Sequence, residues 1–81
     1  MMGLVTRVSA EEYAQAQGLE PVQIDGIPEG FSFRAPDIQI GDNHYQGGYV
    51  ALLPRKNWST SPIVRAETGR ELLNLYNKNV K

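Results

Sequence analysis

The stretch FSFRAPDIQIGDNHYQGGYVALL, residues 31–53, decides the fold that we predict for this chain. Within it, apolar and polar residues alternate in short runs, as they do in strands that bury one face. Polar turn residues separate these runs, as Gly41-Asp42-Asn43 does here and as Asp25-Gly26 and Pro28-Glu29-Gly30 do before this stretch. We therefore predict antiparallel strands joined by tight turns.

The last run of this stretch, His44–Leu53, is interrupted by Gly47-Gly48. Inside a strand, such a pair favours a β-bulge or the close approach of another backbone. It can equally form a turn that splits the run into His44–Gln46 and Tyr49–Leu53. The sequence leaves these alternatives open.

The chain before residue 31 contains one further strand pattern and a helix pattern. Val22 and Ile24 alternate with polar residues ahead of an Asp-Gly turn. A helix is predicted over Ser9–Gly18, because Ser9 and Glu12 have the spacing of a capping box and glycine favours the left-handed residue that ends a helix. Tyr13 is expected to anchor this helix to the core.

The chain after residue 61 ends in an amphipathic helix. Thr68 and Glu71 have capping-box spacing, so the helix is predicted to begin near Thr68 and to run to about Asn79. Ahead of it, Pro62–Arg65 forms either a strand or, with Ser61 as cap, the start of a helix. The apolar face of the terminal helix consists of Leu72, Leu73, Tyr76 and Val80.

These patterns predict one small α+β domain over residues 1–81. It has a short N-terminal helix, an antiparallel meander of three to five strands, and a C-terminal amphipathic helix packed on one sheet face. Both helices are expected to cover the same face. Because the 81 residues include no cysteine, aliphatic and aromatic side chains must supply the core. We predict that Tyr13, Phe31, Phe33, Ile38, Ile40, Val50, Leu52, Leu72 and Tyr76 form it.

The segment 54–62 is bounded by prolines and is polar apart from Trp58, which predicts an irregular exposed loop. Trp58 either folds back over the core or stays exposed as an interface anchor. In the exposed case, Arg55, Lys56, Asn57 and Trp58 form a partner-binding tip.

The net charge of −1 hides an uneven distribution along the chain. Residues 1–40 carry two basic and six acidic side chains, a net −4, whereas residues 41–81 carry six basic and three acidic ones, a net +3. On a helix, Arg70, Asn74, Lys78 and Lys81 form one line of cations and an amide. Such a line favours contact with the phosphates of nucleic acid, although a solvated helix face carries the same residue types.

The sequence contains no clear motif for catalysis, cofactor binding or metal binding. His44 is the single histidine in the sequence. Asp37 or Asp42 is available to orient it, and Ser59 or Ser61 is available as a hydroxyl nucleophile. The spacing of these residues matches no known catalytic motif. Nucleotide-phosphate signatures and metal-ligand sets are missing from the sequence. We therefore predict no enzyme, no cofactor and no metal site.

The sequence favours a small non-enzymatic binding or regulatory module of the adaptor, inhibitor, virus-encoded or accessory-subunit kind. It is expected to dock a protein partner through the loop, an exposed strand edge or the C-terminal helix. Assembly of several copies through a strand edge is a further option. The alternative function is nucleic-acid binding by the basic half. The longest apolar stretch, Tyr49–Leu53, is too short for a membrane span or a signal-peptide core, so a cytoplasmic location without membrane contact is expected.

Overall fold

The centre of the molecule is an antiparallel sheet with strand order β1-β2-β5-β6. The computed structural model describes residues 3–80. The sheet strands are β1 (Glu20–Pro21), β2 (Ser32–Arg34), β5 (Tyr49–Leu52) and β6 (Ile63–Ala66). Within the described residues, α1 (Arg7–Gln17) precedes the sheet, α2 (Gly69–Val80) follows it, and a 3₁₀ turn, η1 (Trp58–Thr60), lies between β5 and β6. The predicted α+β class with its helices at the two ends of the chain is confirmed.

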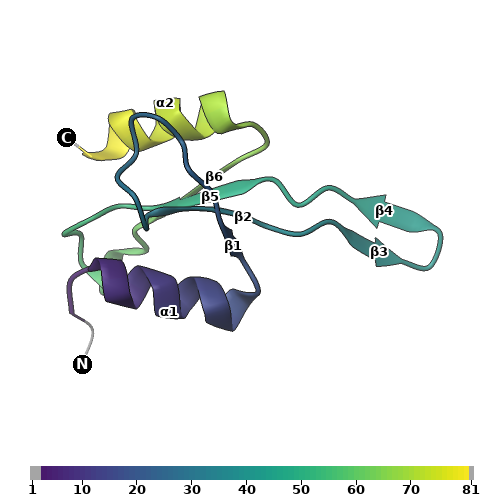
Figure 1. The fold of residues 1–81 in the computed structure, drawn as a ribbon, viewed down its shortest axis with the longest axis horizontal. Helices are drawn as coiled ribbons and strands as arrows, with labels where there is room; N and C mark the ends of the chain where they lie inside the picture. The colour runs from purple at the N-terminus through teal and green to yellow at the C-terminus, as the bar shows by residue number, and fades with distance from the viewer. Residues whose placement is uncertain (1–2, 81) are drawn as a thin grey trace.

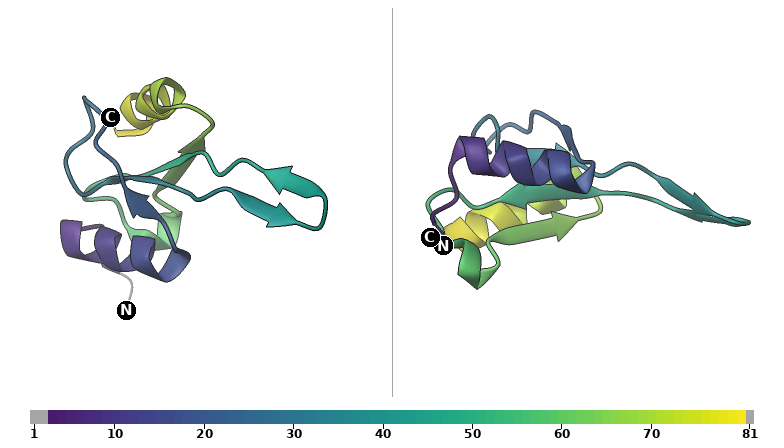
Figure 2. Two further views of the ribbon diagram at one scale, coloured as in Figure 1. Left: turned by 45° about the vertical axis from the view of Figure 1, so that its right-hand side comes forward. Right: turned by 90° about the horizontal axis from the view of Figure 1, so that it is seen from below.

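Between β2 and β5 the chain leaves the main sheet and forms a second sheet of two strands before it returns. Its strands, β3 (Ile38–Ile40) and β4 (Asn43–Tyr45), pair antiparallel with Gln39 opposite His44. Figure 1 shows this hairpin projecting to the right, away from both helices, and the two turned views of Figure 2 show the same projection. We call residues 35–48, which include the hairpin and its two connections to the body, the arm.

The two helices lie on opposite faces of the main sheet, so the expectation that both cover one face was wrong. Ala10 and Ala14 of α1 pack with Phe33 and Leu52 on one face. Leu72 and Tyr76 of α2 pack with Ala51 and Leu53 on the other. Neighbouring residues of a strand point to opposite faces, so β5 delivers apolar side chains to both helices. Figure 1 shows α2 above the sheet and α1 below it.

The core follows from these two layers. Phe33, Val50, Leu52, Leu72 and Tyr76 are buried as predicted, and Tyr13 and Phe31 pack against the core while partly exposed. Six buried apolar residues were not among those predicted: Val5, Ala10, Ala14, Ile27, Ala51 and Leu53. Two predictions were wrong, because Ile38 and Ile40 lie on the arm, where neither helix covers them, and are 54% and 64% exposed.

The N-cap of α1 was predicted three residues too late, at Ser9. Thr6 is the N-cap, and its hydroxyl accepts from the Ser9 amide at 3.1 Å while the Ser9 hydroxyl accepts from the Thr6 amide at 2.8 Å. Ser9 thus closes the capping box from inside the helix instead of opening it. Gly18 ends the helix in the left-handed region with φ 72°, as predicted.

The other elements settle the remaining alternatives. The segment after Pro62 is strand β6, not a helix start, and α2 begins beside Thr68, whose hydroxyl accepts from the Glu71 amide at 3.2 Å. The strand predicted at Val22–Ile24 instead lies earlier, as the two-residue β1. Residues 46–48 separate β4 from β5, but Gly47-Gly48 does not form the turn of the split version.

Candidate docking surface

The arm owes its shape to a tight turn between its two strands. Ile40 pairs with Asn43, so Gly41 and Asp42 alone form the loop. Gly41 has φ 61°, and Asp42 is not among the residues with positive φ. A positive φ at the first loop position only is the pattern of a type II′ turn, whose twist matches that of paired strands. The predicted Gly41-Asp42-Asn43 turn signal therefore produces a hairpin.

The root of the arm is held by a close approach of two backbones. A Cβ on Gly47 would overlap the carbonyl oxygen of Ala35, so only glycine fits there. The Ala35 amide donates to the Gly48 carbonyl at 2.9 Å, and the Gly47 amide donates to Asp37 Oδ1 at 3.0 Å. These contacts align the arm with β2 and β5, and they bear out the predicted close backbone approach at the glycine pair.

One face of the arm is apolar and exposed. Ile38 lies directly opposite Tyr45, and Ile40 shares its face because residues two apart in a strand point the same way. Tyr45 is 53% exposed, comparable to the two isoleucines. The described chain has five exposed large apolar residues, and three of them are on this face. We call Ile38, Ile40 and Tyr45 the arm face.

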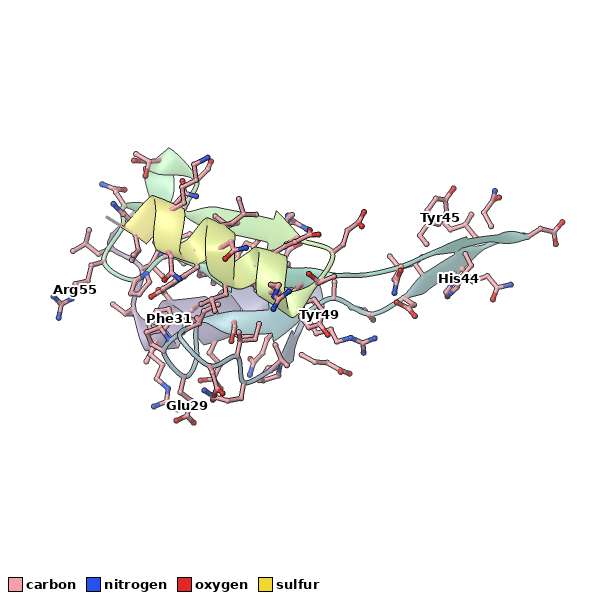
Figure 3. The ribbon with its side chains drawn as sticks, turned by 90° about the horizontal axis from the view of Figure 1, so that it is seen from above. Glu29, Phe31, His44, Tyr45, Tyr49 and Arg55 are labelled. Carbon is pink, nitrogen blue, oxygen red and sulfur yellow. The ribbon has the colours of Figure 1, made fainter. Side chains whose placement is uncertain are left out.

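The opposite face of the arm is polar. His44 points away from Tyr45, as Figure 3 shows, and its Nε2 lies 3.7 Å from Asp37 Oδ2. Both side chains are exposed, so solvent screens this pair. The hydroxyl candidates Ser59 and Ser61 belong to the loop after β5 and form no hydrogen bond with His44.

The loop 54–62 is more ordered than its composition suggests. Trp58 is half-buried: its ring packs against Tyr13, and its indole N–H donates to the Ser9 hydroxyl at 3.3 Å. Pro62 is buried, and Asn57 pairs with Leu4. Of the two alternatives for Trp58, the structure favours the one in which it folds back over the core.

Arg55 and Lys56 lie beside an open groove at the end of the molecule remote from the arm. This end groove has a volume of about 690 Å³. Its apolar lining consists of Val5, Pro28, Phe31, Pro54 and Val80. Figure 3 shows Arg55 and Phe31 at one end of the molecule and Tyr45 and His44 at the other. The predicted partner-binding residues are thus divided, with Arg55 and Lys56 at this groove and Trp58 in the packing against α1.

The predicted basic line follows the exposed side of α2. Arg70, Asn74 and Lys78 are exposed and spaced one helical turn apart, while Lys81 lies outside the described residues. Glu71 stands next to Arg70 in the first turn, so the line is not purely cationic. Nucleic-acid binding by these residues stays a prediction.

The free strand edges differ in how well they suit a partner. At the edges of the main sheet, β1 has two residues, and β6 presents the exposed Arg65. Short length and a charged side chain are devices that discourage pairing with another chain. The arm has a free backbone edge on each of its strands, beside the apolar arm face.

The part of the chain from residue 3 to residue 80 contains no group of three or more side chains arranged to hold a metal ion. No helix in that range is both long and apolar enough to cross a bilayer. Comparisons of the chain with protein-family models, with curated proteins and with solved structures gave no match.

Sequence reasoning missed the arm as a surface, although it located both of its strands. Ile38 and Ile40 have the alternation of residues that face a core. A separating signal was present, because Pro36 and Gly47-Gly48 bracket the hairpin and isolate it from the longer apolar run Tyr49–Leu53. Strand-breaking residues at equal distances on the two sides of a turn indicate that the two strands leave the main sheet together.

Proposed function

We propose that this protein is a non-enzymatic protein-binding module whose docking element is the arm. The observation that carries the proposal is the exposure of Ile38, Ile40 and Tyr45 together on one face of a projecting hairpin. Clustered apolar side chains at a protruding position are typical of a surface that another protein covers. A projecting strand pair needs no preorganised pocket in order to bind.

The arm lacks packing contacts that would cover its apolar face. An isolated two-stranded hairpin is only marginally stable in water, and each of these strands has three residues. Contact with a partner removes the arm face from water, at roughly 25 cal/mol per Å² of apolar area. Strand addition at a free edge also supplies backbone hydrogen bonds. Both gains come from the same few residues.

The test compares capture of host proteins by three forms of the chain. The first is the wild type, and the second is an arm variant carrying Ile38→Thr, Ile40→Thr and Tyr45→Thr. Threonine preserves β propensity and removes most of the apolar surface. The matched control is Val8→Thr, because Val8 is 65% exposed on α1 but remote from the arm.

The proposal expects a partner captured by the wild type and by Val8→Thr but lost with the arm variant. After purification of that partner, the arm variant should bind it at least about tenfold more weakly, the equivalent of about 1.4 kcal/mol. Equal binding of the partner by all three forms would refute a docking role for the arm.

The alternative function, nucleic-acid binding, is supported by the exposure of Arg70, Asn74 and Lys78 along α2. Its test is titration of the chain with single- and double-stranded nucleic acid at low salt. Charge reversal by Arg70→Glu with Lys78→Glu should then lower the affinity and reduce its salt dependence. If the wild type binds neither form at low salt, this alternative is excluded.

A further inference from the structure

We propose that a second copy of this chain occupies the arm face, with the arm of one copy docked in the end groove of the next. This inference rests on the proposed function, because it identifies the partner of the same arm. It requires two complementary surfaces on one molecule. The arm face supplies one of them and the end groove the other.

The end groove matches the arm face in apolar character. Five apolar residues line it, and its volume of about 690 Å³ lies within the range of about 300–1,000 Å³ typical of pockets that bury small molecules. Such a space accommodates large side chains at a hairpin surface. Burial of Ile38, Ile40 and Tyr45 against this lining would cover apolar area on both copies.

Charge selects the groove over other sites for the arm. The arm, residues 35–48, carries Asp37 and Asp42 and no lysine or arginine. The end groove carries Arg55 and Lys56, and the acidic Glu29 at that end is paired with Arg7 at 3.2 Å. An arm in the groove therefore brings opposite charges together.

The same charges disfavour the symmetric alternative, in which two arm faces pack against each other. That contact would bring together two arms that each carry Asp37 and Asp42 and no lysine or arginine, with Asp42 at the turn and Asp37 on the polar face beside His44. Like charges brought together at an interface oppose association. The arm–groove contact has no such penalty.

The positions of the two surfaces determine the form of the assembly. Figure 3 shows the arm and Arg55 at opposite ends of the molecule. A contact between different surfaces of identical chains is head-to-tail, and it continues into a ring or a filament instead of stopping at a dimer. The contact is small, so the assembly is expected to be weak and dependent on concentration.

Sedimentation velocity and light scattering over a range of protein concentrations test the inference. The wild type should show a mass that rises with concentration beyond twice the monomer mass of 9.0 kDa. The arm variant described above should remain a monomer, as should a groove variant carrying Arg55→Glu and Lys56→Glu. If that groove variant has a lowered melting temperature, Arg55→Gln with Lys56→Gln tests the same charges more gently.

The controls are Val8→Thr, for the loss of apolar surface, and Arg34→Glu with Arg65→Glu, for an equal change of charge at exposed residues away from the groove. Both should assemble as the wild type does.

Mixing the two inactive variants gives the sharpest readout. The arm variant keeps an intact groove, and the groove variant keeps an intact arm. An equimolar mixture should therefore form a complex of two chains that cannot grow further, although each variant alone is monomeric.

The outcomes separate this inference from the proposed function. A wild type that stays monomeric at every concentration overturns self-assembly, and the capture experiment then decides the proposed function independently. Assembly that needs the arm but survives in the groove variants overturns the arm–groove contact in favour of the symmetric one. Assembly that survives in the arm variant overturns the inference as a whole.

Discussion

The rings of Tyr13 and Trp58 pack together with their centroids 5.6 Å apart and their planes inclined by 36°. This contact joins α1 to the turn η1, which are distant in the sequence, and the Trp58 indole reinforces it by donating to Ser9. The loop after β5 is thereby fixed to the α1 side of the sheet. Arg55 and Lys56 are presented at the end groove from that same anchored loop.

Replacement of Trp58 by alanine should destabilise the fold. The half-buried ring loses its packing with Tyr13 and its hydrogen bond to Ser9, and we expect a loss of about 2–3 kcal/mol in the free energy of unfolding. Urea denaturation followed by circular dichroism measures this loss. Trp58→Phe is the control, because it keeps an aromatic ring and should retain most of the stability. An unchanged unfolding free energy in Trp58→Ala would mean that this contact does not hold the loop.

Replacement of Gly47 by alanine should disrupt the root of the arm. The new Cβ would overlap the Ala35 carbonyl, so one of the two backbones must move. We expect a loss of about 2 kcal/mol or more in the free energy of unfolding, within the range of backbone-strain effects. Gly3→Ala serves as the comparison, because no atom lies within 4 Å of the added carbon. Equal stability of the two variants in urea would argue against the close approach.

The isoleucines of the arm should contribute little to folding. Ile38→Thr with Ile40→Thr removes apolar groups that solvent already reaches, so the melting temperature should change by no more than a few degrees. Phe33→Ala, by contrast, empties a buried site beside α1 and should cost about 3–5 kcal/mol. Differential scanning calorimetry compares the two. A large destabilisation by the isoleucine substitutions would place the arm face in the core after all.

Alkaline pH should weaken the fold through Tyr76. Burial raises the pKa of its hydroxyl above the ordinary value of 10.0, because the phenolate is poorly solvated there. The folded chain therefore holds this proton to higher pH than the unfolded chain. The resulting stabilisation is complete below pH 10 and is lost as the pH rises through the higher pKa of the folded state.

The measurement for Tyr76 is urea denaturation at intervals between about pH 8 and about pH 11. The free energy of unfolding of the wild type should fall more steeply above pH 10 than that of Tyr76→Phe, which has no hydroxyl at this position. The remaining tyrosines are common to both chains and cancel in the comparison. Parallel curves would show that burial of Tyr76 does not couple its ionisation to folding.

Much of the fold could be predicted because the relevant signals are local. The left-handed end of α1 at Gly18 and the hairpin turn at Gly41 depend on backbone preferences of single residues. The amphipathic pattern around Leu72 and Tyr76 located α2 closely, because a 3.6-residue period is an intrinsic property of a helix. The N-cap of α1 was misplaced because Thr6 and Ser9 can both cap a helix. Only the folded geometry selects Thr6.

The candidate docking surface could not be derived from the sequence in the same way. Alternation shows that Ile38 and Ile40 share a face with each other, as Phe31 and Phe33 do, but it does not show what covers that face. Whether a strand face is covered is a non-local property, because it depends on where the two helices pack.

The sequence by itself determined the order of the helices, the turns and the strand periodicity, because short-range sterics and hydrogen bonding dictate them. Only the tertiary structure decided that α1 and α2 lie on opposite faces and that neither reaches the arm. Burial is the outcome of packing between segments far apart in the chain, so the same alternating pattern yields core at Phe33 and an exposed surface at Ile38.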